Sequence, residues 1–220
     1  MTRGLFVTGT DTGVGKTLVA AAVLHALTGC GKRAVGMKPV SAGLAVDGSA
    51  NPDVAALLAA GNVDAPLPDR NPFAFVSAIA PHLAAAEAGT TIDLAEIAAA
   101  YARLAARSDY VVVEGAGGAL VPIDATHDML DIAAHLRLPV LLVVGMRLGC
   151  LNHALLSAAA IRARGLGLAG WVANCIDPRM AALAANVKAL SERLQAPRVA
   201  TIAWRAPPIL SPGALDKLFA

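Results

Sequence analysis

One stretch of the sequence decides the fold: residues 9–17, which read Gly-Thr-Asp-Thr-Gly-Val-Gly-Lys-Thr. The apolar segment 4–8 before it predicts a buried strand, and the segment 18–27 after it has the length and composition of a helix. A glycine-bearing loop that ends in Gly-Lys-Thr between a strand and a helix is the sequence context of a phosphate-binding loop. The chain is therefore expected to bind a nucleoside triphosphate.

Each residue type in this loop suits the binding of phosphate. Gly13 and Gly15 can adopt backbone conformations that other residues rarely reach, so successive N–H groups can point at an anion. The helix that follows adds the positive end of its dipole. Lys16 can reach the β- and γ-phosphates, and the hydroxyl of Thr17 can hold Mg²⁺. Five residues, rather than the usual four, separate Gly9 from Gly15.

Length and composition narrow the class of protein. A chain of 220 residues fits one α/β domain with a substantial core. The hydrophobic fraction is 56%, but the apolar stretch 140–146 falls far short of the ~20 residues of a membrane-spanning helix. A net charge of +2 and 4% aromatic residues argue against nucleic acid and membrane surfaces as partners. The start of the chain runs directly into the predicted strand and leaves no room for a signal peptide, so we expect a cytoplasmic location.

A second informative stretch is residues 109–118, Asp-Tyr-Val-Val-Val-Glu-Gly-Ala-Gly-Gly. A buried strand that ends in a carboxylate has the form of a Walker B element, in which the acidic residue acts on the Mg²⁺ held by the loop threonine. This predicts that Glu114 and Thr17 act on the same ion. The glycines that follow permit close approach of the backbone to phosphate or substrate.

A second strand is predicted over residues 33–38, because Pro39 cannot donate to a ladder. Residues just past the carboxyl ends of parallel strands line the ligand crevice, which would place Lys38 on the same rim as Lys16. A solvated lysine at a strand end is the alternative. Residues 41–52 are predicted to form a loop over the site. Asp53 precedes a predicted helix, where an Asp is more often a cap or first-turn residue than a metal ligand.

The rest of the chain alternates between strands and helices. The proline-rich segment 61–76 is expected to be a surface excursion. Helices are predicted over 54–60, 78–88, 92–106, 128–135, 149–164 and 181–194, and strands over 138–144, 168–174 and 198–202, before a tail that ends in a short helix. This order predicts an α/β fold of the P-loop NTPase kind, a single domain (1–220) with a mainly parallel sheet and helices on both faces.

Several of these segments together resemble the dethiobiotin synthetase family. The matching segments are 7–12 with 15–17, 38–40, 114–118, 148–153 and 170–174, and Asn71-Pro72 and Pro81-His82 also stand where the family has them. The resemblance spans about residues 4–205. It implies ATP-dependent closure of a ureido ring, in which 7,8-diaminononanoate, CO₂ and ATP give dethiobiotin, ADP and phosphate.

The resemblance also implies roles for individual residues. Lys38 and Lys16 would be catalytic, stabilising a carbamate and the transferring phosphoryl group. Mg²⁺ would be held by Thr17, Asp53 and Glu114. The nucleotide would be bound by Gly13, Val14, Gly15, Lys16, Thr17, Leu18, Asp53, Glu114, Gly115, Ala116, Gly117, Asn174, Ala203, Trp204 and Arg205. The diamine substrate would be bound by Thr12, Ser41, Gly149, Cys150, Leu151 and Asn152.

Within this set, Asn174 would contact the adenine edge, and the loop 149–152 would come from the other subunit of a homodimer whose active site lies at the interface. The chain departs from the family at two positions. Ala42 stands where a hydroxyl residue is common, and Gly13 stands where some relatives have Glu.

Three alternatives use the same loop. An ATPase switch of the MinD/ParA type carries a second lysine early in the loop, where this chain has Thr10 and Asp11. The segment 210–220 also lacks the basic amphipathic character of a membrane-targeting helix. An amidotransferase half would need a fused glutaminase domain. A guanine-binding switch has an N-x-x-D motif, which Asn174 and Asp177 match in spacing but without the usual lysine.

Overall fold

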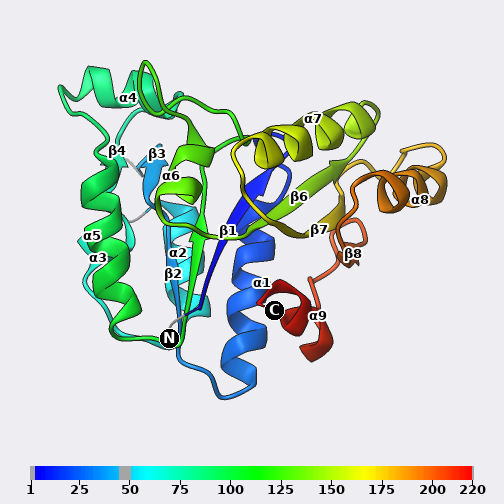
Figure 1. The fold of residues 1–220 in the computed structure, drawn as a ribbon, viewed down its shortest axis with the longest axis horizontal. Helices are drawn as coiled ribbons and strands as arrows, with labels where there is room; N and C mark the ends of the chain where they lie inside the picture. The colour runs from blue at the N-terminus through cyan, green and yellow to red at the C-terminus, as the bar shows by residue number, and fades with distance from the viewer. Residues whose placement is uncertain (1–2, 45–50, 220) are drawn as a thin grey trace.

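The computed structural model describes residues 3–44 and 51–219. Six strands form one sheet in the order β2-β5-β1-β6-β7-β8, and every neighbouring pair is parallel. Their bounds are β1 Arg3–Gly9, β2 Ala34–Met37, β5 Tyr110–Glu114, β6 Val140–Met146, β7 Leu168–Cys175 and β8 Arg198–Ile202. The predicted α/β fold with a parallel sheet is confirmed (Figure 1).

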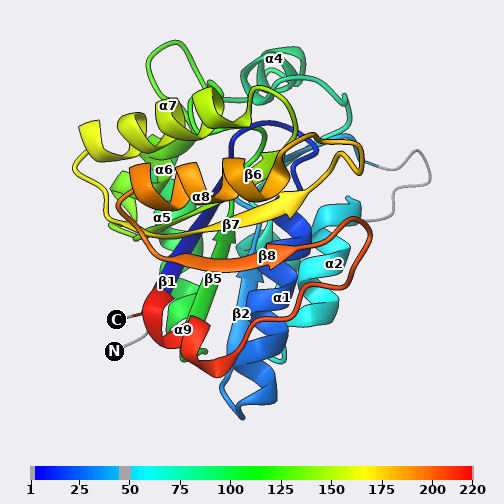
Figure 2. The same ribbon diagram turned by 90° about the vertical axis from the view of Figure 1, so that its right-hand side faces the viewer.

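Helices cover both faces of this sheet. Their bounds are α1 Lys16–Gly29, α2 Pro52–Ala60, α3 Leu67–Arg70, α4 Pro81–Glu87, α5 Leu94–Ala105, α6 Met129–His135, α7 Cys150–Ala163, α8 Leu183–Arg193 and α9 Pro212–Leu218. Figure 2 shows α6, α7 and α8 on one side of the strands and α1 and α2 on the other. In the described part of the chain, no helix combines the length and the apolar character that crossing a membrane requires.

The side chains of the central strand show why both faces are buried. Phe6 packs in the cluster beneath α4 to α8, whereas its neighbours Leu5 and Val7 pack in the cluster formed with α1, α2 and α9. Successive side chains of a strand point to opposite faces, so a strand with helices on both sides is apolar throughout. This explains the continuous apolar runs in the sequence.

The order of the strands places the loops of the predicted site at one end of the sheet, where the carboxyl ends of the strands lie. β1 lies between β5 and β6, and the chain leaves it toward β2 on one side and returns through β6 and β7 on the other. Such a reversal opens a crevice outside the carboxyl ends of the strands. The loop 9–17, Lys38, Glu114 and Asn174 all follow or end strands at this edge.

The prediction for residues 61–76 is wrong in part. This segment is not wholly a surface excursion, because it contains α3 and the short strand β4 (Phe73–Phe75), which pairs in parallel with β3 (Val40–Ala42). Asp69, Arg70 and Asn71 are buried there. Three-residue strands leave no periodic pattern in a sequence, and their pairing joins segments about thirty residues apart.

Two helix starts also differ from the sequence prediction. Helix α4 begins at Pro81 rather than near residue 78, in keeping with the preference for proline in the first turn. Helix α2 is capped by Asn51, whose side chain accepts from the N–H of Asp53, so Asp53 lies in the first turn. Within the predicted loop 41–52, residues 45–50 lie outside the described residues.

The packing of α1 and α2 on β2 depends on Gly36. A Cβ at this position would lie 2.8 Å from Cβ of Leu57 and 3.0 Å from Cδ1 of Leu24. We expect Gly36→Ala to lower the free energy of unfolding by about 1–3 kcal/mol through overpacking. Gly29→Ala is the control, since a Cβ there meets nothing within 4 Å. Equal melting temperatures for the two variants would contradict this account.

Candidate functional site

The loop between β1 and α1 has the conformation that a phosphate-binding loop needs. Gly13 and Gly15 have φ of 74° and 91°, in the left-handed region. A Cβ at Gly15 would lie 2.3 Å from Nδ2 of Asn174, so this position needs glycine for both space and conformation. The same Nδ2 donates to the carbonyl of Val14 at 2.8 Å. Asn174 thereby ties the loop to the end of β7.

Lys16 lies over this loop. Its side chain is buried, and its ammonium donates to the carbonyl of Asp11 at 3.0 Å. Burial, followed by repulsion from Lys38, lowers the pKa of Lys16 to about 8. An anion close to this ammonium would favour its charged form.

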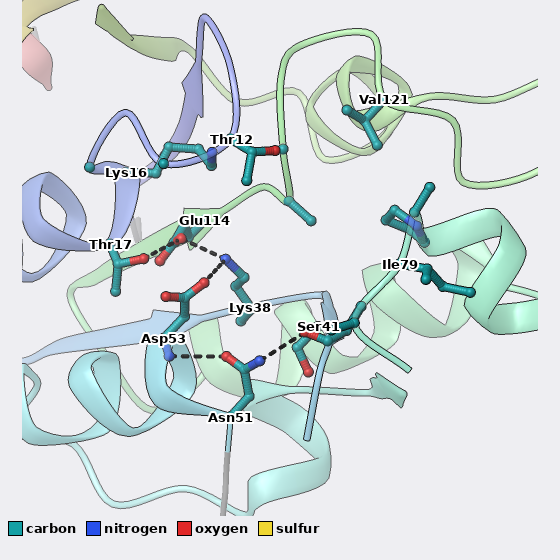
Figure 3. Close-up of a pocket in the computed structure, with 18 of the residues that line it drawn as sticks. Thr12, Lys16, Thr17, Lys38, Ser41, Asn51, Asp53, Ile79, Glu114 and Val121 are labelled. Carbon is teal, nitrogen blue, oxygen red and sulfur yellow. Dashed lines mark hydrogen bonds and ion pairs between the residues drawn. The ribbon is translucent and has the colours of Figure 1, made fainter. Parts of the chain in front are cut away.

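Lys38 lies at the centre of the site, between two carboxylates (Figure 3). Its Nζ lies 2.6 Å from Oε1 of Glu114 and 2.8 Å from Oδ2 of Asp53. The hydroxyl of Thr17 donates to the same Oε1 of Glu114 at 2.8 Å. Four separate elements therefore bring their side chains together: the start of α1, the end of β2, the first turn of α2 and the end of β5.

Burial and the Lys38 ammonium shift the pKa values of the two carboxyl groups in this cluster. Glu114 is fully buried, and burial raises the pKa of its carboxyl, although the ammonium of Lys38 opposes that rise. Burial alone would also raise the pKa of the half-buried Asp53, but the charge and hydrogen bond of Lys38 outweigh it and hold this pKa below its usual range. Each buried charge in the cluster has an opposite charge beside it, and the loss of one partner would leave a buried charge uncompensated.

The cluster forms part of the wall of a cavity of about 830 Å³, a volume in the range of small-molecule sites. Most of the residues predicted for nucleotide, metal and catalysis meet here. The predicted residues that line it are Thr12, Gly13, Gly15, Lys16, Thr17, Leu18, Lys38, Ser41, Asp53, Glu114, Ala116 and Gly117. Val14 and Gly115 belong to the same two loops without lining the cavity.

The oxygen atoms of this cluster fit a magnesium ion. A hydroxyl and two carboxylates are hard ligands of the kind that Mg²⁺ prefers. Among residues 3–44 and 51–219, Oε2 of Glu114 is buried without a hydrogen-bond partner. An oxygen that is buried in this way costs free energy unless a cation or a donor binds it.

Other predicted residues lie outside the cavity of this chain. Residues 203–205 follow β8 and are exposed, with the guanidinium of Arg205 5.3 Å from the ring centre of Trp204. The segment 149–152 forms the start of α7, and none of its residues is among the described ones that line the cavity. Asn174 lies beneath the loop rather than on the cavity wall.

Sequence reasoning missed part of the cavity wall. The residues that line it without having been predicted as site residues are Ala42, Asn51, Ala78, Ile79, Ala80, Pro81 and Val121. Asn51 carries a signal in the sequence, since it precedes Pro52 at a helix start and caps that helix. Ile79 and Val121 lie in loops, where an apolar residue gives no pattern to read.

The chain is similar to known proteins over most of its length. The model of a family described as an AAA domain matches residues 3–208. The chain is 54% identical over 197 residues to the ATP-dependent dethiobiotin synthetase BioD of Nitrosospira multiformis, covering 90% of this chain and 86% of that one. It is 50% identical over 202 residues to the protein of the same name from Aromatoleum aromaticum, covering 91% and 90%.

Solved structures of proteins with low sequence identity to this chain share its fold. The septum site-determining protein MinD from Pyrococcus horikoshii superposes with a TM-score of 0.59 at 16% identity, covering 99% of this chain and 87% of that one. The cell division protein FtsY from Thermotoga maritima superposes with a TM-score of 0.54 at 16% identity, covering 100% and 69%. At this identity the likeness shows the fold alone, that of P-loop NTPases.

The charge balance of the site leads to a prediction about stability. Removing the ammonium in Lys38→Met leaves the buried Glu114 carboxylate beside Asp53 without a cation, which costs about 3 kcal/mol of unfolding free energy. Added Mg²⁺ is expected to recover part of this loss, because it supplies positive charge to the same carboxylates. Thermal denaturation with and without Mg²⁺ measures both effects. Lys32→Met, at an exposed lysine, is the control, and an unchanged melting temperature in Lys38→Met would contradict the prediction.

Proposed function

The chain belongs to the family of ATP-dependent dethiobiotin synthetases, and we propose that it closes the ureido ring of dethiobiotin from 7,8-diaminononanoate and CO₂. ATP is converted to ADP and phosphate in this reaction. The observation that carries the proposal for this chain is the buried ammonium of Lys38, which lies in the cavity wall beside the phosphate-binding loop. This arrangement provides positive charge where a carbamate would meet a γ-phosphate.

The reaction needs ATP for a chemical reason. One amine of the substrate takes up CO₂ as a carbamate, which is a poor electrophile. The carbamate oxygen attacks the γ-phosphate, ADP leaves, and a carbamic-phosphoric anhydride forms. The second amine then attacks the anhydride carbon, phosphate leaves, and the ring closes. The protein contributes mainly positioning and neutralisation of charge, as in other phosphoryl transfers.

We assign these contributions to residues of the cavity. The loop residues Gly13 to Leu18 bind the phosphates, with Lys16 near the β- and γ-phosphates. Lys38 stabilises the carbamate and the transferring phosphoryl group. The oxygens of Thr17, Asp53 and Glu114 hold Mg²⁺, and the ion supplies neutralisation of the phosphate charge when it is bound. Oε2 of Glu114, which is buried without a hydrogen-bond partner, supports this last assignment.

The remaining assignments concern the base, the diamine and a second copy of the chain. Asn174 and residues 203–205 contact the base, and Thr12 and Ser41 contact the diamine. Gly149, Cys150, Leu151 and Asn152 bind the substrate carboxylate across the interface of a homodimer. None of the four is among the described residues that line the cavity of their own chain, so this role requires a second copy of the chain. Because ATP is a substrate, we place the enzyme in the cytoplasm.

A coupled assay tests the proposed reaction. Purified protein receives Mg-ATP, bicarbonate and 7,8-diaminononanoate, and the release of ADP and the formation of dethiobiotin are followed together. We expect the two products in a one-to-one ratio and only when the diamine is present. ATP hydrolysis that does not respond to the diamine would contradict the proposal and favour an ATPase switch.

The role of Lys38 is tested by its removal. Lys38→Ala is expected to abolish turnover, because the carbamate and phosphoryl charges lose their cation, while ATP binding stays largely intact on the separate loop. Turnover is measured with the coupled assay and ATP affinity by calorimetry. Lys32→Ala is the matched control at the surface. Activity near that of the wild type in Lys38→Ala would remove this residue from the mechanism.

The role of Thr17 is tested by a pair of substitutions. Thr17→Val removes the hydroxyl but keeps the shape of the side chain, so activity that depends on Mg²⁺ should be lost. Thr17→Ser keeps the hydroxyl and should retain most of the Mg²⁺-dependent activity. A titration of activity against Mg²⁺ compares the two, and an unchanged titration curve in Thr17→Val would count against the metal assignment.

A further inference from the structure

The backbone at Lys38 lies beyond the reach of the main sheet. The ladder between β2 and β5 joins Ala34 to Tyr110 at one end and Met37 to Val113 at the other. Lys38 is the next residue along the chain, and Pro39 after it has no N–H with which to continue a ladder. Another element must therefore fix the backbone from which the Lys38 ammonium projects.

The segment between α3 and β4 provides this support. The N–H of Lys38 donates to the carbonyl of Arg70 at 2.7 Å. The carbonyl of Lys38 accepts from Nδ2 of Asn71, also at 2.7 Å. One residue further on, the N–H of Phe73 donates to the carbonyl of Pro39 at 3.1 Å. Both backbone polar groups of Lys38 are thus bonded to two consecutive residues of this segment.

Asn71 is the one side chain in this set of contacts, and each of its polar atoms is used. Its Nδ2 also donates to the carbonyl of Phe73 at 3.2 Å, and its Oδ1 accepts from the hydroxyl of Ser41 at 2.9 Å. The residue is buried, with 8% of its surface exposed. An amide is required here, because the position needs two donors and one acceptor. Asp, which has the same shape, would direct a second acceptor at two carbonyls.

We propose that Asn71 is a positioning residue that holds Lys38, and with it Ser41, at the geometry required for phosphoryl transfer. This inference rests on the proposed function. Asn71 does not line the cavity, so it acts through Lys38 and not by contact with substrate. A displacement of about 1 Å at a reacting group can cost about 100-fold in rate, which gives a hydrogen bond to the backbone of Lys38 a large effect on turnover.

The same strand offers a matched control. Asn62 bonds to the backbone at the other end of β2: its Nδ2 donates to the carbonyl of Lys32 and its Oδ1 accepts from the N–H of Ala34, both at 2.9 Å. It lies away from the cavity. Asn62 and Asn71 thus make similar hydrogen bonds to the backbone at opposite ends of β2, and only Asn71 bonds to Lys38.

The experiment compares Asn71→Ala, Asn71→Asp and Asn62→Ala by kcat, by KM for ATP and by melting temperature. We expect both Asn71 variants to lose about 10- to 100-fold in kcat, while KM for ATP changes less than about twofold, because the phosphate loop lies on another element. Asn62→Ala is expected to lower the melting temperature and to keep kcat within about twofold of the wild type. If Asn71→Asp has the kcat of the wild type, or if Asn71→Ala loses no more kcat than Asn62→Ala, the proposal is wrong.

A second arm tests whether the effect passes through Lys38. In the Lys38→Arg background, which keeps a positive charge at this position and so a measurable rate, Asn71→Ala should cause a much smaller further loss of ADP release than it causes in the wild type, whereas an added loss of the full size would show that Asn71 acts elsewhere. Should Asn71→Ala fail to fold, Asn71→Ser keeps one donor and should have a kcat between those of Asn71→Asp and the wild type. The wild-type assay with and without the diamine is read first, so a failure of the proposed function is seen separately from a failure of this inference.

Discussion

The region around the site depends on one ion cluster, in which the buried ammonium of Lys38 lies between the buried carboxylate of Glu114 and the half-buried carboxylate of Asp53. A fully buried carboxylate is costly unless it is paired, and the pairing succeeds only if the partners are held at hydrogen-bond distance. The three side chains come from β5, from the residue after β2 and from α2, so the cluster requires all three elements to be in place. The folding of this region and the pairing of charges in the site therefore depend on each other.

The parallel sheet brings most of these elements to the same place. Because β1 lies between β5 and β6, the carboxyl ends of neighbouring strands open toward the same side, and the loop 9–17 begins there. The left-handed backbone at Gly15 brings the loop close to the end of β7, where Asn174 donates to the carbonyl of Val14. The phosphate-binding loop is thus held by the strand on one side and by an amide on the other.

The sequence predicts those parts of the site that rest on local patterns. Gly13, Gly15, Lys16 and Glu114 stand in motifs whose strand and helix context can be read directly, and the structure places them on one cavity wall. The small sheet of β3 and β4 could not be predicted, because its strands are too short for a period and pair across about thirty residues. Asn71 could not be given a role either, because its partners are the hydroxyl of Ser41 and backbone groups that only the folded chain brings close.

The two halves of the site consequently differ in how they are built. The loop that would hold phosphate is fixed by the main sheet, which this chain shares as a fold with proteins only 16% identical to it. Lys38 lies where that sheet ends, and its backbone is fixed by the segment 70–73. Asp69, the residue before this segment, forms an ion pair with Arg103 of α5 in which Nε and Oδ1 lie 2.6 Å apart. The backbone of the phosphate loop and the backbone of Lys38 thus depend on different contacts, so a change in the small sheet can move Lys38 and leave the phosphate loop intact.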